Sequence, residues 1–301
     1  MDSKLRSHIY FVVLLLLGAV IFFFPIGALG RLAFRNETYS HIPLIPVMSL
    51  FFLGMQRKNI SAVAGRRPAT GLAVCATGLA LYGIAFALRE HLNSPAFRNQ
   101  DVSNDYLTLC TAGVVVWIIG SFIAIYGTRA FKEARFALLF LVFMIPIPMF
   151  LLDRIITALQ YASAEAADIV FGLTGASYYR NGMIFEFPNV AVRVAEECSG
   201  IRSSLSLFIL ATITGFFFLR TRSRRVILAL AIFPITVVKN GFRIVTVTLL
   251  ANYVDMRFIT HHWIHQSGGI PFFAVALMMF IPIVWLLRKS EARAERRAHG
   301  A

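Results

Sequence analysis

The chain has 301 residues, of which 58% are hydrophobic and only 15% charged, with three cysteines and a formal net charge of +14. This apolar fraction exceeds what a soluble domain can bury, so we expect the lipid bilayer to be the solvent of much of the chain. Three cysteines are too few for a disulfide-rich secreted scaffold.

Eight apolar stretches follow one another along the chain, and most have the length of about 20 residues that spans a bilayer as a helix. They lie at 9–27, 41–56, 69–88, 108–127, 136–152, 201–219, 226–252 and 269–287. The second is short and contains Pro43 and Pro46, so it is the weakest of the eight. The first follows Lys4 and Arg6 but lacks a good cleavage site, which favours an uncleaved helix over a signal peptide.

The basic residues gather in alternate connecting segments. Most of them lie at 4–6, 57–67, 129–135, 220–225 and 288–297. The positive-inside rule then predicts a multi-pass protein of the cytoplasmic (inner) membrane with both termini in the cytoplasm. The positive charge is thereby explained by topology, and we expect membrane lipid, and no nucleic acid, as a partner.

The segment between the fifth and sixth stretches is the most structured of the predicted outer segments. Apolar residues recur at helical spacing from Ile155 to Leu173, opposite Gln160 and Ser163, which predicts an amphipathic helix on the outer membrane surface. Asn181-Gly182 then separates two short alternating runs, a strong signal for a β-hairpin. A further alternating run, 190–194, leads directly to Cys198.

Cys198 is the cysteine with polar neighbours, at the predicted N-terminus of the sixth span. The free N–H groups and positive dipole end of a helix N-terminus lower the pKa of a thiol. Arg202 adds positive charge, whereas Glu196 and Glu197 act in the opposite direction. The alternative is an inert interfacial cysteine, which is how we interpret Cys75 and Cys110 inside apolar stretches.

Arg243 lies inside the seventh stretch, about 14 Å from its outer end along a helix axis. A charge at that depth is costly, so it should face a protein interior or a wet cavity. Asn240, three residues earlier, shares its face of the helix. The alternative is an arginine whose side chain extends to the interface.

A histidine cluster, His261, His262 and His265, precedes the eighth stretch. Asp255 is the acid nearest in sequence, so the cluster does not favour a metal site, and we expect neither metal nor cofactor. His265 is followed by Ser267-Gly268-Gly269, which permits close backbone approach, and it is therefore the preferred acid/base group. His261 and His262 remain alternatives.

Three motifs resemble those of the exosortase/archaeosortase family of multi-pass membrane cysteine transpeptidases. They are AEECSGIR around Cys198, NGFR ending at Arg243, and IHQSGG around His265. MIPIP in the fifth stretch and the predicted hairpin are also similar, so the resemblance covers about 136–287. It implies that Cys198, Arg243 and His265 are catalytic.

The resemblance also implies the substrate: exported proteins whose C-terminal sorting signal has a short motif, often Pro-Glu-Pro, an apolar helix and a basic tail. Cys198 would form a thioester, Arg243 would stabilise the oxyanion, and His265 would act as acid and base. We expect Asn240, Arg202 and Glu197 to contact the substrate.

The fold expected is an all-α integral membrane bundle of about eight helices, with a small extracytoplasmic hairpin and an amphipathic helix before Cys198. We treat the chain as one polytopic domain with N-terminal helices at 1–135, a catalytic core at 136–287 and a basic cytoplasmic tail at 288–301. A polytopic transporter, a thiol-dependent acyltransferase and a non-catalytic scaffold remain alternatives.

Overall fold

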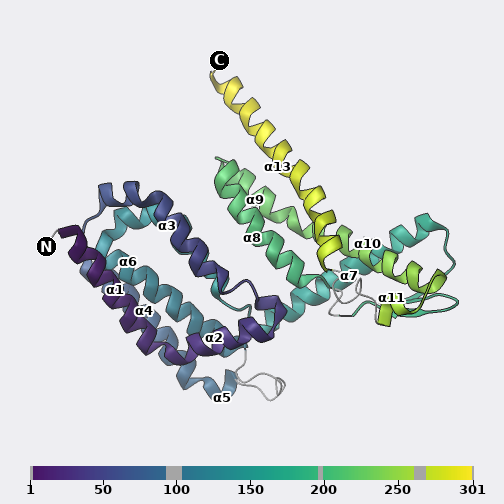
Figure 1. Cartoon of the computed structure of the whole chain (residues 1–301), viewed down its shortest axis with the longest axis horizontal. Helices are drawn as coiled ribbons and strands as arrows, with labels where there is room; N and C mark the ends of the chain where they lie inside the picture. The colour runs from purple at the N-terminus through teal and green to yellow at the C-terminus, as the bar shows by residue number, and fades with distance from the viewer. Residues whose placement is uncertain (1–2, 93–103, 196–198, 261–268, 300–301) are drawn as a thin grey trace. The chain divides into compact units, whose positions relative to one another are not determined.

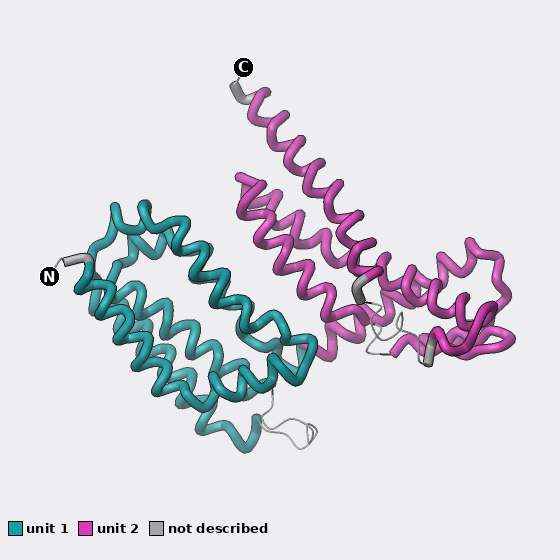
Figure 2. Tube along the Cα trace, in the orientation of Figure 1, with its two compact units in different colours: residues 1–151 teal, residues 152–301 magenta. Residues whose placement is uncertain are grey.

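The computed structural model describes residues 3–92, 104–195, 199–260 and 269–299 (Figure 1). They form two compact units, Met1–Leu151 and Leu152–Ala301 (Figure 2). The described residues are 83% helical and include one small three-stranded sheet, which confirms the predicted all-α membrane architecture. The division into one polytopic domain stays a prediction.

Unit 1 consists of helices of very different length. They are α1 (Ser3–Ile21), α2 (Phe23–Arg35), η1 (Glu37–Tyr39), α3 (Leu44–Val63), α4 (Pro68–Ala87), α5 (Arg89–Leu92), α6 (Asn104–Phe140) and η3 (Leu141–Met144). The chain bends by 77° between α1 and α2. Phe22 occupies the bend and is buried against Tyr82 and Trp117, which holds the corner in place.

Helix α6 doubles back on itself at Gly127, where φ is 88° and ψ is 169°. A straight helix of 37 residues would be about 55 Å long. Instead, the Thr108 hydroxyl near its start donates to the carbonyl of Pro146, beyond its end, at 2.8 Å. A side chain at position 127 would meet the Gly65 carbonyl oxygen at 1.9 Å, so only glycine fits this reversal.

This reversal accounts for the difference between eight predicted stretches and the spans observed. Six helices of the described residues are long and apolar enough to cross a membrane, or seven if the bent pair α1–α2 is one span. Asn104–Met144 counts among them once, although it contains both the fourth predicted stretch and most of the fifth. The predicted fifth helix is therefore the returning arm of α6, followed by the turn before α7.

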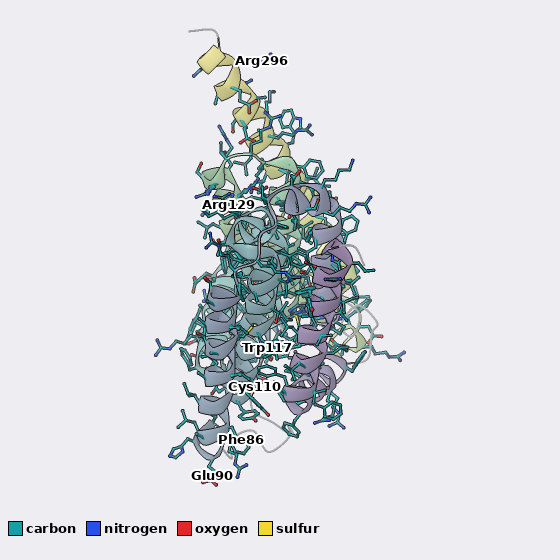
Figure 3. All side chains as sticks on the ribbon, turned by 90° about the vertical axis from the view of Figure 1, so that its left-hand side faces the viewer. Phe86, Glu90, Cys110, Trp117, Arg129 and Arg296 are labelled. Atoms are coloured by element: carbon teal, nitrogen blue, oxygen red, sulfur yellow. The ribbon has the colours of Figure 1, made fainter. Side chains whose placement is uncertain are left out.

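Small residues allow the helices of unit 1 to approach closely. A side chain at Gly71 of α4 would lie 2.2 Å from the backbone nitrogen of Ala124 in α6. Such contacts are a common way for membrane helices to associate. Figure 3 shows Arg129 towards one end of this bundle, Glu90 at the other, and Trp117 and Cys110 between them.

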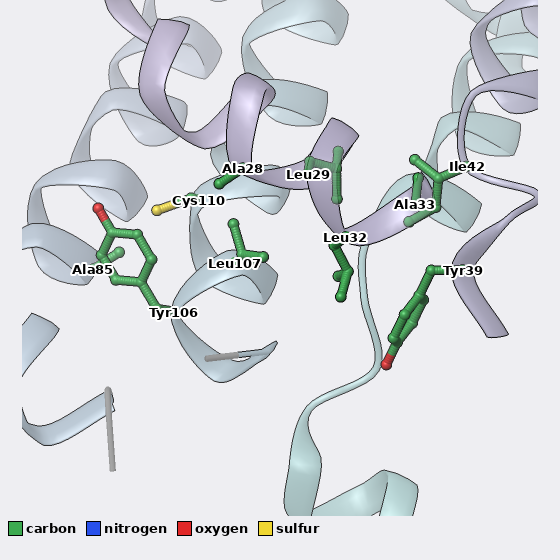
Figure 4. Packing of buried hydrophobic residues seen from close by; sticks show 10 residues of the cluster. All are labelled: Ala28, Leu29, Leu32, Ala33, Tyr39, Ile42, Ala85, Tyr106, Leu107 and Cys110. Carbon is green, nitrogen blue, oxygen red and sulfur yellow. The ribbon is translucent and has the colours of Figure 1, made fainter. Parts of the chain in front are cut away.

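One core cluster of unit 1 joins α2 to α4 and α6, and Figure 4 shows its ten buried residues. Tyr39 is one of the two tyrosines among them, and its hydroxyl accepts a hydrogen bond from the amide of Asn104 at 2.9 Å. Cys110 also lies in this cluster and is fully buried, as expected of a cysteine acting as a small apolar residue.

Unit 2 contains the three strands of the sheet and the remaining helices of the described residues. They are α7 (Met149–Thr174), β1 (Tyr179–Asn181), β2 (Ile184–Glu186), β3 (Ala191–Arg193), α8 (Ile201–Phe218), α9 (Arg222–Leu230), α10 (Ile232–Tyr253), α11 (Arg257–Thr260) and α13 (Gly269–His299). Helices α8, α9, α10 and α13 share a core that includes Leu207, Leu228, Ile235 and Ala276.

The predicted hairpin is confirmed, but its turn is Gly182-Met183, one residue later than the predicted Asn181-Gly182. Strands β1 and β2 pair antiparallel with Asn181 opposite Ile184, and Gly182 has the positive φ of 60° that such a tight turn requires. Strand β3 adds to β2, which gives a three-stranded meander in the order β1-β2-β3. Its buried Phe185 packs on Phe171 of α7.

Helix α7 confirms the helix predicted before Cys198, but the orientation of its polar residues differs from the prediction. Gln160 and Ser163, predicted on the polar outer side, are buried, whereas Ile169 and Leu173 of the apolar stripe are exposed. The reason is that both polar side chains have hydrogen-bond partners inside unit 2, so the side of α7 that carries them is an interior side.

Candidate active site

Three of the six predicted site residues lie outside the described residues: Glu197, Cys198 and His265. The alternatives His261 and His262 do so as well. The structure describes the chain on both sides of Cys198, from Val194 and Ala195 before it to Ser199 and Gly200 after it. It also describes Asn240 and Arg243, which the sequence pattern assigned to the same site.

The carbonyl of Ser199, the residue after Cys198, is held by a side chain of α10. The amide nitrogen of Asn240 donates to this carbonyl oxygen at 2.5 Å and also lies 3.4 Å from the hydroxyl of Ser163 on α7. Asn240, Ser163 and Ser199 are all 0% exposed. Two helices distant in sequence therefore meet at the residue that follows Cys198.

Gly200 makes this contact possible because it has φ 72° and ψ 17°, in the left-handed region that favours glycine. A side chain at this position would lie 2.2 Å from the Asn240 amide nitrogen. Glycine is thus required here both by the backbone conformation and by the approach of α10. The same residue is the N-cap of α8.

The structure adds Lys239 and Ser203 to the surroundings of this turn, and the sequence analysis missed both. The ammonium of Lys239, a residue only 4% exposed, donates to the hydroxyl of Ser203 at 2.5 Å. The Ser203 hydroxyl in turn donates to the carbonyl of Gly200 at 2.9 Å. A lysine inside an apolar stretch, four residues before Arg243, was the available signal.

The approach to Cys198 from the sheet is also fixed by a buried amide. Gln160 of α7 donates to the carbonyl of Val194 at 3.2 Å, just after β3. Before β3, the backbone N–H of Asn189 donates to the side chain of Asn252 at the end of α10, and the side-chain amide of Asn189 donates to the carbonyl of Asn252. The β-meander is therefore attached both to α7 and to α10.

Arg243 is half-buried and lies three residues after Asn240 on α10, on the side of the helix that also carries Lys239. Arg202 is exposed in the first turn of α8. Asn240 is thus in contact with the turn after Cys198, Arg243 lies one helical turn beyond it, and Arg202 lies at the start of α8.

The comparison with family models identifies the kind of protein. Residues 30–282 match the model of the transmembrane exosortases. The chain belongs to the transmembrane exosortase family. No curated protein and no solved structure matches it. This exosortase is a membrane protein, and its family acts on exported proteins that carry C-terminal sorting signals.

The hairpin of this exosortase is attached to α7 by an ionic cluster. Arg180 donates to both carboxylate oxygens of Glu165, at 2.5 and 3.1 Å, and to Asp168 at 2.9 Å. The hydrogen bonds from Arg180 lower the pKa of Glu165, and the bonds to Glu165 raise the pKa of Arg180. Burial raises the pKa of Tyr178, whose hydroxyl donates to Asp168 at 2.7 Å.

The described part of the chain contains no group of three His, Cys, Asp or Glu side chains arranged to hold a metal ion. The polar residues gathered at the turn after Cys198 are amides, hydroxyls and cations instead. Such groups orient backbone and stabilise negative charge.

Proposed function

We propose that this exosortase is a membrane cysteine peptidase/transpeptidase that cleaves the C-terminal sorting signal of exported proteins through a thioester on Cys198. The observation that carries the proposal is the hydrogen bond from buried Asn240 to the Ser199 carbonyl. It connects the NGFR motif of α10 to the residue beside the cysteine, as a shared active site requires. The exosortase family is generally one of cysteine transpeptidases.

In the first step, the Cys198 thiolate attacks the scissile carbonyl carbon of the substrate, and a tetrahedral oxyanion forms. Arg243 stabilises that oxyanion with the planar donors of its guanidinium. When the C–N bond breaks, His265 gives a proton to the leaving amine, and the acyl group remains on sulfur as a thioester. His265 then removes a proton from the acceptor as it attacks the thioester.

The substrate enters this scheme through its own membrane helix. An apolar helix with a basic tail keeps the substrate in the bilayer, so that its short motif lies at the membrane surface. We place the reaction at the outer face of the cytoplasmic membrane, with both termini of the exosortase in the cytoplasm. Arg202 and Glu197 contact the motif in this proposal, whereas Asn240, predicted as a third substrate contact, is buried and holds the Ser199 carbonyl instead.

The position of Cys198 also fits a nucleophile. Ser199 and Gly200 lead directly into the first turn of α8, an 18-residue helix. The positive end of the α8 dipole and the cations Arg202 and Arg243 favour a thiolate over a thiol. Their combined effect on Cys198 is opposed by the neighbouring Glu196 and Glu197.

Replacing the cysteine tests the proposal directly. Cys198→Ala should abolish processing of a membrane-anchored reporter that ends in a Pro-Glu-Pro motif, an apolar helix and a basic tail. Cys110→Ala is the matched control and should keep normal activity per folded molecule, because Cys110 is buried in unit 1. The readout is the mass of the released reporter and of its new C-terminus.

Normal processing by Cys198→Ala would overturn the proposal. A reporter that gains an acyl group without losing its C-terminal signal would instead favour an acyltransferase. The mass of the product separates these outcomes in one experiment.

A further inference from the structure

We propose that Lys239 and Ser203 are positioning residues of the exosortase site, which act together to fix the backbone turn that carries Cys198. This inference rests on the proposed function, because it assumes that Cys198 is the nucleophile. It concerns two side chains that have no part in the chemistry described above, one from α10 and one from α8.

The first observation is the burial of Lys239. A lysine almost never lies fully buried unless a partner compensates its charge. Lys239 is 4% exposed and its ammonium donates to the Ser203 hydroxyl at 2.5 Å. A hydroxyl is a neutral acceptor, so this pair does not neutralise the charge as a carboxylate would. A hydrogen bond to a hydroxyl does not offset the full cost of removing this charge from water.

The second observation is where the hydrogen bonds lead. Ser203 receives the bond from Lys239 and donates its own proton to the Gly200 carbonyl at 2.9 Å, a carbonyl that also accepts from the hydroxyl and the backbone N–H of Ser204. The chain Lys239–Ser203–Gly200 thus has a single direction, from the cation to the backbone. A hydroxyl that accepts from a cation is a stronger donor to its next partner.

The third observation is that a second residue of α10 also holds the turn. Its neighbour Asn240 donates to the carbonyl of Ser199. Consecutive residues of α10 therefore hold consecutive carbonyls of the turn, Asn240 directly and Lys239 through Ser203. Because the peptide unit is planar and trans, fixing each carbonyl also fixes the direction of the following N–H.

Together these bonds set the orientation of the Ser199–Gly200 and Gly200–Ile201 peptide planes. The Ser199 carbonyl points towards Asn240. The N–H of Gly200 belongs to the same trans peptide unit and therefore points away from Asn240. Gly200 has a left-handed conformation, and as a glycine it has no side chain that would restrict the turn to one conformation. An external clamp from α10 is a direct way to hold such a turn in one conformation.

The test uses variants of both residues in the full-length protein in membranes. Lys239→Met and Ser203→Val should each lower kcat for the Pro-Glu-Pro reporter by about 100-fold, the loss typical of a small misplacement of a reacting group. KM should stay within about threefold, since the clamp does not touch the substrate. Ser203→Thr keeps the hydroxyl in the shape of valine and should restore most of the rate.

Coupling between the two residues is the second readout. If they act as one unit, the double variant Lys239→Met/Ser203→Val should lose no more activity than Lys239→Met alone. Thr236→Val on α10 and Thr212→Val on α8 are matched controls and should process the reporter normally. Thr212 bonds a backbone carbonyl of its own helix, as Ser203 does, but away from the turn.

All rates are expressed per folded molecule, measured by thermal unfolding in detergent. Equal rates for Ser203→Val and Ser203→Thr, or additive losses in the double variant, would overturn the inference. If Lys239→Met does not fold, the pair Ser203→Val and Ser203→Thr decides the question. Activity in Cys198→Ala would instead refute the proposed function, whatever the clamp variants show.

Discussion

The two units bury polar side chains for different purposes. In unit 1, buried polar groups join helix to helix: the Ser49 hydroxyl donates to the carbonyl of Ala137, and the Trp117 indole donates to the carbonyl of Leu14. In unit 2, Gln160 and Asn240 donate to the carbonyls of Val194 and Ser199, which lie outside helices and strands. These bonds join helices to one another in unit 1, whereas in unit 2 they fix the backbone at Val194 and Ser199, on either side of the segment that contains Cys198.

This difference means that similar substitutions should damage the units in different ways. A change in unit 1 should lower the amount of folded protein and leave the activity of each folded molecule intact. A change at the turn of unit 2 should lower activity by more than it lowers stability. The three predictions below use matched pairs to test that contrast.

The largest effect is expected at Gly200. Gly200→Ala places a methyl group 2.2 Å from the Asn240 amide nitrogen and forces a left-handed alanine, so the turn must shift. We expect a loss of processing of at least about 100-fold per folded molecule. Gly71→Ala is the counterpart in unit 1, where the methyl group meets the backbone of Ala124.

Gly71→Ala should reduce the yield and the thermal stability of the protein and leave the specific activity unchanged. Quantitative purification measures the yield, thermal unfolding in detergent measures the stability, and the reporter assay measures the specific activity. If Gly71→Ala lowered specific activity as much as Gly200→Ala, the division of roles between the units would be wrong.

A moderate effect is expected at Gln160. Gln160→Leu removes the donor to the Val194 carbonyl and leaves a buried acceptor unpaired, at a cost of about 1–3 kcal/mol. Because that carbonyl lies on the way to Cys198, we expect roughly a tenfold loss of specific activity. Trp117→Phe removes a comparable bond in unit 1 and should change only thermal stability. Steady-state kinetics and unfolding curves of both variants check the contrast.

The smallest effect is expected at the exposed ion pair of the hairpin. Arg180 lowers the pKa of Glu165, so the pair stabilises the docked hairpin when the carboxylate is charged. This contribution is present above the unfolded pKa of Glu165 and is lost as the pH falls through its lower folded pKa. Limited proteolysis of the hairpin should therefore accelerate about two- to threefold in acid.

Glu165→Gln should show the faster cleavage already at neutral pH and lose this part of the pH dependence. Glu90→Gln, in unit 1, is the matched control and should leave the cleavage of the hairpin unchanged at every pH. A wild-type hairpin whose cleavage does not respond to acid would contradict the role of the pair.

Periodicity and turn signals in the sequence predicted most elements correctly. The apolar stretches became helices, and Gly182 formed the hairpin turn because it supplies the positive φ that such a tight turn needs. A reversal between the fourth and fifth stretches was predicted, but its form was not, because Gly127 makes it within one residue only where Gly65 packs against it. The assignment of the catalytic roles to Cys198, Arg243 and His265 stays a prediction.

Pairings between distant residues were the least predictable part of the site. Ser203 and Lys239 are 36 residues apart, and neither carries a motif that identifies the other. Gln160 and Ser163 looked like solvent-facing residues of α7, because a hydrophobic pattern cannot distinguish a polar group facing water from one with a buried partner. Tertiary hydrogen bonds, and not local spacing, decide these positions.

The buried carboxylate of Glu291 has a consequence for the order of assembly. It accepts the backbone N–H groups of Arg220 and Thr221, and the Thr221 bond links residues 70 positions apart at 2.7 Å. On the ribosome, the connection between α8 and α9 must therefore wait for about 70 further residues before its amides find their partner. Unit 2 is completed only after α13 has been synthesised, so a stalled or shortened chain leaves the helix that follows Cys198 without its anchor.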